Sequence, residues 1–358
     1  MMCNKKRLAV FSQLMLLTVF LAGCSTGNRK AEWITDALQS IKDGRYPRIV
    51  AVSYWNEIWE NSNGSISDLT INSSPETLEA FQTGIADDVI VAQTVYSADS
   101  QKVLPPESGI YFSAYPDFGD SEDTVTAERI EDFEALAVKQ IAWVYFSNNW
   151  IDGIEFPHEA VATIHEYSRL PFIRMMAISN YDRICPDSVY TLQRIIDGDF
   201  DEELSEWAQD AKVFGFPLMV EFGVEVNGEW FPWNGAWNGG DTTGGYGDPA
   251  QPDGPERFKD AYRHIIDLFR GEGATNITWV FHVNSGNFPD ESWNSKTAYY
   301  PGDEYIDWIG ISAYGALSKK EARQNWETFT QVMDTYYPEL AAISASKPLA
   351  VLEFGVVE

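Results

Sequence analysis

The chain has few basic residues for its size. Of its 358 residues, 25 are Lys or Arg and 54 are Asp or Glu, so the formal net charge is −29 at pH 7. Proteins that bind DNA or RNA do so mainly through clusters of Lys and Arg. The acidic residues are spread along the chain, which is typical of a solvated surface. The composition therefore argues against a nucleic acid as the partner.

Motifs for metals and phosphates are also missing. The three cysteines and four histidines show no zinc spacing, and the chain has no internal repeat or coiled-coil heptad. Glycines at 239–247 have no GKS or GKT sequence beside them, so they predict a flexible active-site loop rather than a phosphate cradle. Asp241, Asp248 and Asp253 in the same region lack the EF-hand spacing, which disfavours a calcium site.

The N-terminus resembles a targeting segment. A basic stretch, Lys5–Arg7, precedes an apolar run, and Leu21-Ala22-Gly23-Cys24 then matches the bacterial lipoprotein box. We expect residues 1–23 to be a lipoprotein signal peptide and Cys24 to be lipidated. The protein would then be a lipid-anchored lipoprotein of the cell envelope, facing the periplasm or the cell exterior. An ordinary signal peptide with a chance cysteine is the alternative.

The expected domain organisation follows from this segment. Residues 24–46 would form a tether and a leading helix near Glu32–Lys42, and residues 47–358 a single domain, which we expect to be a monomer. With Cys24 lipidated, Cys185 has no partner. The sequence therefore predicts a packed Cys185 thiol and no disulfide.

Apolar segments alternate with amphipathic ones along residues 47–358. This alternation predicts a parallel (β/α)8 TIM barrel, and the lack of a glycine-rich fingerprint after the first strand disfavours a doubly wound sheet. Residues 89–94 remain an ambiguous ninth run. The eight predicted strands are Ile49–Tyr54, Ile110–Ala114, Ile141–Phe146, Phe172–Ile178, Leu218–Val224, Ile277–Val283, Ile306–Ser312 and Leu349–Glu353. The predicted helices between them are Ala127–Ala137, Pro157–Tyr167, Glu202–Phe214, Pro255–Arg270 and Lys319–Tyr336.

Two of the predicted strands end at a glutamate. Glu225 follows Leu218–Val224 and is itself followed by three aromatic residues, and Glu353 ends the last strand. Barrel enzymes keep their catalytic groups at the carboxyl ends of their strands. Two carboxylates beside aromatic rings suit glycoside hydrolysis, in which one acts as acid and the other as nucleophile. Hydrogen-bonding neighbours would keep one ionised, while burial against Trp230 would raise the pKa of the other.

The sequence around these residues resembles glycoside hydrolase family 26, a family of retaining barrel glycosidases. The resemblance covers most of residues 109–358. Its motifs are the segment Glu225–Trp233, the segment from Tyr299 to Tyr314, and Leu352-Glu353-Phe354-Gly355.

The resemblance implies an endo-acting enzyme without metal or organic cofactor, in which Glu225 is the acid/base and Glu353 the nucleophile. It also implies that Trp230 is a sugar platform and that Tyr314 holds the nucleophile. From their places at strand ends and beside the motif, we add Trp233, Asn227, His282, Trp55 and Glu57 as candidate substrate-binding residues.

The family mostly cleaves β-1,4-mannan, which is the expected polysaccharide substrate. Mixed-linkage β-glucan or β-1,3-xylan is the alternative, because Val224 stands where the family's mannanases commonly have His. A second class of function is a surface glycan-binding lipoprotein without turnover. The presence of both glutamates favours the enzyme.

The strand order departs from the family pattern. The family's acid/base lies on the fourth strand and its nucleophile on the seventh, yet only five residues follow Glu353. We therefore expect residues 48–55 to close the barrel as the eighth strand, as in a circular permutation, between Ile110–Ala114 and Leu349–Glu353. An open barrel would leave bare strand edges. A truncated sequence without an eighth strand is the alternative.

Overall fold

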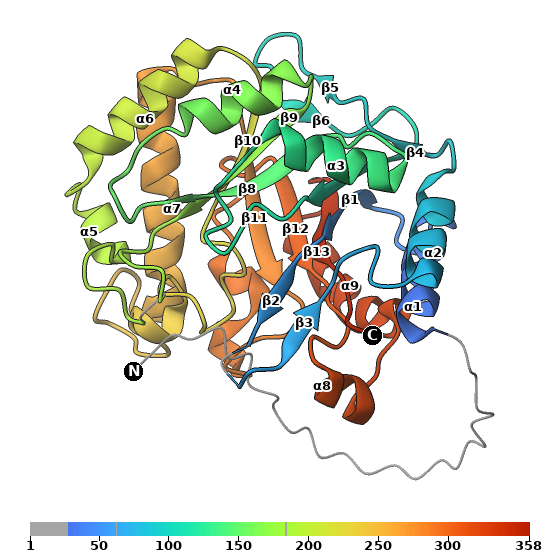
Figure 1. Cartoon of the computed structure of the whole chain (residues 1–358). Helices are drawn as coiled ribbons and strands as arrows, with labels where there is room; N and C mark the ends of the chain where they lie inside the picture. Colours follow the sequence, from blue (N-terminus) through green and yellow to red (C-terminus); the bar gives the residue numbers. More distant parts are fainter. Residues whose placement is uncertain (1–27, 62, 183–184) are drawn as a thin grey trace.

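The fold is a closed barrel of eight parallel strands surrounded by helices (Figure 1). The structure, a computed structural model, describes residues 28–61, 63–182 and 185–358. Around the barrel the strands follow the order β1-β13-β12-β11-β10-β9-β8-β7, and β7 pairs again with β1. They are β1 (Ile49–Trp55), β7 (Ile110–Tyr115), β8 (Trp143–Asn149), β9 (Leu170–Met176), β10 (Leu218–Phe222), β11 (Ile277–Asn284), β12 (Trp308–Ser312) and β13 (Leu349–Phe354).

Strand β1 closes the barrel, as the sequence predicts. On one side it pairs in parallel with β7, from Ala51 opposite Tyr111 to Trp55 opposite Tyr115. On the other side it pairs in parallel with β13, beginning at Ile49 opposite Leu349. No gap is left beside β13, so the open-barrel alternative is wrong.

All eight predicted strands are present, with shifted ends. The ambiguous run at 89–94 contains only the short β4 (Ile90–Val91), which pairs with β7. Two antiparallel hairpins were not predicted. They are β2 (Ile58–Glu60) with β3 (Ile66–Asp68), and β5 (Val95–Tyr96) with β6 (Val103–Leu104).

Several helices begin or end at capping residues. Thr126 accepts a hydrogen bond from the backbone of Arg129 at the start of α3, and Gly215 ends α6 in the left-handed conformation at φ 71°. Among the described residues the α-helices are α1 (Arg29–Lys42), α2 (Pro75–Ile85), α3 (Ala127–Ala137), α4 (His158–Glu166), α5 (Leu192–Ile196), α6 (Asp201–Phe214), α7 (Asp253–Glu272), α8 (Lys319–Gln324) and α9 (Phe329–Ile343).

The single helix predicted over Lys319–Tyr336 is wrong, because the structure has two helices there. α8 ends at Gln324, and α9 begins after Thr328. Thr328 and Gln331 form a reciprocal capping box, which fixes a new helix start. A capping signal inside the apolar pattern was therefore overlooked.

The helix expected before the first strand is α1, and it packs against the barrel. The Trp33 side chain is buried, with its ring 6.3 Å from that of Phe354 on β13 and 5.5 Å from that of Phe329 on α9. This packing covers the junction of the first and last strands. Residues 1–27, including the predicted signal peptide and Cys24, lie outside the described residues.

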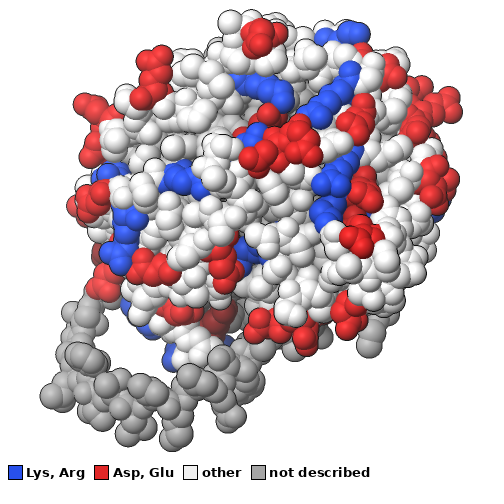
Figure 2. Space-filling model, turned by 180° about the vertical axis from the view of Figure 1, so that it is seen from behind, with Lys and Arg blue, Asp and Glu red and all other residues white. Residues whose placement is uncertain are grey.

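Acidic side chains occur across the face shown in Figure 2, with Lys and Arg among them. On this face the basic residues do not form one large continuous surface of the kind that binds nucleic acids. The distribution agrees with the solvated surface expected from the sequence.

Candidate active site

A cleft opens at the carboxyl ends of the barrel strands. Its empty volume is about 840 Å³, open solvent at the mouth included. The lining side chains come from β1, β9 and β13, from the segments after β1, β7, β10 and β12, and from the start of α8. They are Trp55, Glu57, Trp59, Asn61, Glu122, Arg174, Glu225, Trp230, Phe231, Tyr314, Leu317, Ser318, Glu321 and Glu353.

Glu225 lies just beyond β10 on a turn with unusual backbone geometry. Gly223 has φ 74°, and Glu225 itself has φ 49°, a left-handed conformation that is uncommon for a residue other than glycine. The Glu225 side chain is 2% exposed, and the Trp230 indole Nε1–H donates to its Oε2 at 2.8 Å. The turn therefore aims the carboxyl group into the cleft beside an aromatic ring.

Buried side chains hold this turn from below. Trp233 Nε1 donates to the carbonyl of Val224 at 2.8 Å, and Asn234 Nδ2 donates to the carbonyl of Val226 at 2.7 Å. At Gly223, an added Cβ would lie 2.4 Å from the Phe258 ring, so only glycine fits. These contacts offset the cost of the left-handed Glu225.

Glu353 projects from β13 into the same cleft and is 3% exposed. The Tyr314 hydroxyl donates to its Oε2 at 2.8 Å. Its Oε1 accepts no hydrogen bond from the described residues, and Arg174 Nη2 lies 3.5 Å away from it. One carboxylate oxygen is therefore held, and the other faces a cation.

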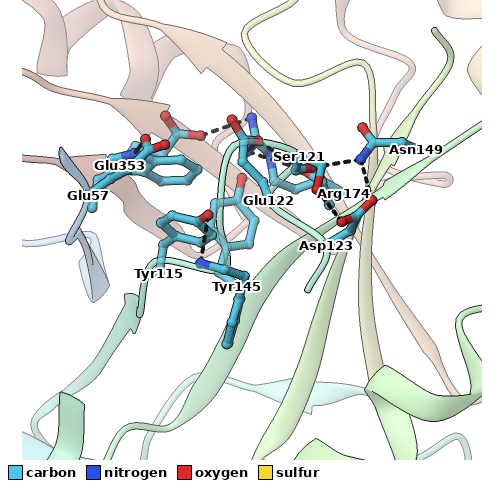
Figure 3. A network of polar contacts seen from close by, with 12 residues as sticks. Glu57, Tyr115, Ser121, Glu122, Asp123, Tyr145, Asn149, Arg174 and Glu353 are labelled. Carbon is cyan, nitrogen blue, oxygen red and sulfur yellow. Dashed lines mark hydrogen bonds and ion pairs between the residues drawn. The ribbon is translucent and has the colours of Figure 1, made fainter. Parts of the chain in front are cut away.

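Arg174 on β9 is the buried cation of the site. Its Nη1 donates to Glu122 Oε2 at 2.7 Å (Figure 3). Its Nε lies 3.6 Å from Glu221 Oε1. Its guanidinium carbon lies 5.0 Å from the centre of the Trp55 ring, so an aromatic face covers it. Together with its contact to Glu353, Arg174 joins three carboxylates from different parts of the chain.

Glu122 reaches Arg174 from the loop after β7. Its backbone is left-handed at φ 62°, and its carbonyl accepts from the Ser147 backbone at 2.8 Å. Asn149 Nδ2 donates to the carbonyl of Ser121 at 2.7 Å and to Asp123 Oδ2 at 3.0 Å (Figure 3). The end of β8 thus fixes the loop on both sides of Glu122.

A polar layer inside the barrel supports the cleft from below. His282 on β11 contacts Glu221 Oε2 through Nδ1 at 3.0 Å and Ser312 Oγ through Nε2 at 2.9 Å. Tyr145 donates a short hydrogen bond to Glu221. Burial lowers the pKa of His282, but the charge and hydrogen bond of Glu221 outweigh it, so the pKa lies above its ordinary value.

The pKa of the Glu353 carboxyl is raised above its ordinary value. Burial is the main cause, and the nearby charge of Glu225 adds to it. The cation of Arg174, His282 and the Tyr314 hydrogen bond act in the opposite direction. The expected hydrogen-bonding neighbour is present in Tyr314, but burial dominates the direction of the shift.

Six of the nine predicted catalytic and substrate-binding residues line the cleft. They are Glu225, Glu353, Trp230, Tyr314, Trp55 and Glu57. Trp55 stacks on Tyr115 with the rings 4.1 Å apart, and its Nε1 donates to Glu57 Oε2 at 2.7 Å. The closing strand therefore delivers both residues to the catalytic mouth.

The other three predicted substrate-binding residues are buried and do not line the cleft. Trp233 is 2% exposed and supports the Glu225 turn, and His282 is 1% exposed beneath the cleft. Asn227 is fully buried, donates to the carbonyls of Asn284 and Gly286 at 3.0 Å, and so ties two loops together. Trp233 and Asn227 follow β10 and His282 lies on β11, but all three side chains turn inward rather than toward the cleft.

The sequence reasoning missed Arg174, Glu122 and Glu221. Arg174 and Glu221 interrupt apolar strands, and a charged residue within a buried strand is a readable signal of a buried polar site. Trp59 and Asn61 were missed because the β2–β3 hairpin was not predicted.

The prediction of no disulfide is wrong for Cys185, which is disulfide-bonded in the structure. The other cysteines, Cys3 and Cys24, lie outside the described residues. The Cys185 side chain is buried, as expected for a packed position. Cys3 was assigned to the removed signal peptide and Cys24 to a lipid, which left Cys185 without a partner. Because one sulfur atom cannot carry both a thioether-linked lipid and a disulfide, lipidation of Cys24 and its pairing with Cys185 exclude each other.

Known proteins resemble parts of this chain. A sequence model described as glycosyl hydrolase family 26 matches residues 165–347. Endoglucanase H of Acetivibrio thermocellus is 33% identical over 169 residues, which is 47% of this chain and 17% of that protein. A mannan endo-1,4-beta-mannosidase of Bacillus subtilis is 27% identical over 118 residues, covering 31% of this chain and 27% of that protein. Beta-1,3-xylanase TXYA of a Vibrio species is 24% identical over 163 residues, covering 45% and 28%.

The chain therefore spans less than a third of the length of each of these three relatives. Among solved structures, a family 26 β-mannanase from Bacteroides ovatus aligns over 91% of this chain and 77% of its own, with 14% identity and a TM-score of 0.42.

Within the described ranges, no three His, Cys, Asp or Glu side chains converge to hold a metal ion. None of the helices in the same ranges combines the length and apolar character needed to cross a bilayer.

Replacing Arg174 with Met should destabilise the fold by about 3–5 kcal/mol, because buried carboxylates lose their cation. The pKa of Glu353 should rise further above that of an unfolded glutamate, since Arg174 lowers it. The folded variant then binds more protons than its unfolded state. The difference in unfolding free energy between the parent protein and the variant should therefore grow as pH rises from about 5 to 7. Denaturant unfolding at both pH values measures this.

The matched control is Arg45→Met, which removes a pair with Asp334 whose side chains are 53% and 47% exposed. An exposed ion pair contributes little to stability. An equal loss of stability in both variants would contradict the role of Arg174 as the cation that stabilises the buried carboxylates. A stability loss in Arg174→Met that shrinks as pH rises would contradict it as well.

Proposed function

The chain belongs to glycosyl hydrolase family 26, and from this premise we propose that it is an endo-acting, retaining β-glycanase. The observation that carries the proposal is the pair of buried glutamates, Glu225 just after β10 and Glu353 near the end of β13, which face one cleft. Half-buried Trp230 lies beside them and offers an aromatic face to a sugar.

Glu353 is the proposed nucleophile, acting through Oε1. Tyr314 holds Oε2, which leaves Oε1 to attack the anomeric carbon. As this bond forms, the bond from the anomeric carbon to the leaving oxygen breaks, and Glu225 gives that oxygen its proton. The product of this step is a covalent glycosyl-enzyme.

Water completes the reaction in the second step. Glu225, now ionised, takes a proton from a water molecule whose oxygen attacks the anomeric carbon, and the bond to Glu353 breaks. Two inversions retain the anomeric configuration. Such a mechanism requires the two carboxyl groups to lie about 5–5.5 Å apart.

Arg174 suits this mechanism, because Glu353 must be ionised to attack. Burial opposes ionisation, and Arg174 and Tyr314 favour it. When Glu225 gives up or regains its proton, the charge beside Glu353 changes, which couples the two carboxyls.

β-1,4-Mannan is the proposed substrate, since mannan-cleaving enzymes are among the relatives. Mixed-linkage β-glucan is the second candidate, and β-1,3-xylan follows. Two observations favour β-glucan: Endoglucanase H has the higher identity over the longer stretch, and Val224 replaces the histidine common in the family's mannanases. A glycan-binding protein without turnover is the other class of function, and the two glutamates that face one cleft count against it.

We also propose that Cys24 is lipidated and anchors the enzyme to the cell envelope as a monomer. The proposal rests on the lipoprotein box at residues 21–24 and on the basic and apolar stretches before it.

Glu353→Ala should abolish hydrolysis of all β-glycans, because the nucleophile is lost. Glu225→Ala should retain substrate binding but lose about 100- to 10,000-fold of its rate on substrates with poor leaving groups. Released reducing ends measure the rate, and NMR of the first product should show the retained anomer. The matched control is Glu229→Ala, an exposed glutamate in the same loop. Near-normal rates for either catalytic variant, or an inverted first product, would refute the assignment.

A panel of mannan, glucomannan, lichenan and β-1,3-xylan should show the highest rate on mannan. Hydrolysis of lichenan alone would replace mannan by mixed-linkage β-glucan. Binding to the panel without any hydrolysis would favour the non-catalytic alternative.

Cys24→Ala should move the protein from the membrane fraction to the soluble fraction, because the thioether-linked lipid is lost. Cys185→Ala is the control and should stay with the membrane. Retention of Cys24→Ala in the membrane fraction would show that the lipoprotein assignment is wrong.

A further inference from the structure

The β2–β3 hairpin forms one wall of the cleft. Trp59 pairs across the hairpin with Ser67, and this pair faces inward. Ile58 and Ile66 lie on the other face and are 49% and 46% exposed. The alternation of a strand thus places one aromatic ring toward the cleft and two aliphatic side chains away from it.

The Trp59 ring is held in one orientation by a chain of hydrogen bonds. Its Nε1 donates to Asn61 Oδ1 at 3.2 Å, and Asn61 Nδ2 donates to Ser67 Oγ at 2.8 Å. Ser67 Oγ donates in turn to the carbonyl of Leu317 at 2.5 Å. Because the indole N–H is already hydrogen-bonded within the protein, Trp59 can bind a ligand through the face of its ring. A fixed aromatic face is a low-cost platform for binding.

Polar groups lie next to the hairpin, at the start of α8, where the carbonyl of Leu317 accepts the hydrogen bond from Ser67. Glu321 accepts a hydrogen bond from the Leu317 backbone at 2.9 Å, and Ser318 caps the helix. Both side chains line the cleft and are half-buried. This wall therefore combines an apolar ring with carboxylate and hydroxyl oxygens, the combination that a pyranose ring requires.

The position of the hairpin in the barrel indicates which part of the substrate it meets. The hairpin follows β1, and β1 lies four strands from β10 in both directions around the barrel. Glu225, which follows β10, must reach the leaving oxygen, and Trp230 donates a hydrogen bond to Glu225. The leaving sugar therefore lies on the β10 side of the cleft. The hairpin is on the opposite side, next to the nucleophile strand β13.

We propose that Trp59, with Glu321 and Ser318, forms a sugar-binding subsite on the non-reducing side of the cleaved bond. Its occupant is the second sugar from that bond. One sugar face packs on Trp59, and its hydroxyls bond to Glu321 and Ser318. The proposal rests on the proposed function, because the direction of the chain depends on Glu225 being the acid.

The charge of the cleft restricts the occupant to a neutral sugar. Glu57, Glu122, Glu225, Glu321 and Glu353 line it, with Arg174 as the one basic side chain among the lining residues. A uronate in such a cleft would meet like charges at short range, which disfavours binding.

The test compares dinitrophenyl β-glycosides of one sugar and of two, in both the mannose and the glucose series. The monoside fills the position next to the cleaved bond, and the bioside also reaches Trp59. Trp59→Ala should therefore lower kcat/KM for the bioside about 10- to 100-fold more than for the monoside. Trp59→Phe, which keeps a ring, should restore part of the difference. Ile66→Ala, on the outer face of the same hairpin, should leave both substrates unaffected.

An equal fall for monoside and bioside would mean that Trp59 has only a structural role, and the subsite would be rejected. A ratio unchanged from the parent enzyme would reject it as well. If the parent enzyme hydrolyses neither glycoside, the test is instead the affinity of the Glu353→Gln variant for β-linked tetrasaccharides of mannose and of glucose, measured by calorimetry. Weaker binding by the double variant Trp59→Ala, Glu353→Gln than by Glu353→Gln alone would support the subsite although the proposed function has failed. Equal binding by the two variants would reject both the subsite and the proposed function.

Discussion

The buried guanidinium of Arg174 is the interaction on which the catalytic end of the barrel depends. It contacts Glu122 at 2.7 Å, Glu353 at 3.5 Å and Glu221 at 3.6 Å, and it is 4% exposed. Taking a charge out of water costs several kcal/mol unless partners surround it. Arg174 and its carboxylates can therefore be buried only together. Because they come from β9, β10, β13 and the loop after β7, their pairing also fixes how these four parts of the barrel mouth meet.

The same network sets the balance between the protonated and the ionised form of Glu353. Burial favours a protonated Glu353, and Arg174 and Tyr314 favour an ionised one. Two of the cleft glutamates, Glu122 and Glu225, also have left-handed backbones at φ 62° and φ 49°. Strained conformations persist where the surrounding structure determines them, and they gather at functional sites. Here both left-handed residues direct their carboxyl groups into the cleft.

The strands and the two strand-end glutamates could be predicted because they depend on local periodicity. Which way a side chain faces at a strand end could not, since it depends on the loop that follows. Trp233 turns under the Glu225 loop, whereas Trp59 faces the cleft from a hairpin of three-residue strands. Such short strands carry too little pattern to be recognised. The break between α8 and α9 was readable from the Thr328 capping box, and the interruptions of apolar strands by Arg174 and Glu221 were readable as well.

The closing strand β1 links the architecture to substrate choice. It brings Trp55 and Glu57 to the mouth and leads directly into the hairpin that carries Trp59. These positions, between 55 and 61, lie outside the stretch 165–347 that the family model matches, whereas Glu225 lies inside it. The proposed acid/base and the wall opposite it are therefore encoded in different parts of the sequence. Similarity across the matched stretch supports a shared reaction, but the wall proposed to bind the non-reducing sugar can vary without changing that similarity. Under the proposed function, the choice between mannan and β-glucan would then depend on this wall as well as on Val224, which lies inside the matched stretch.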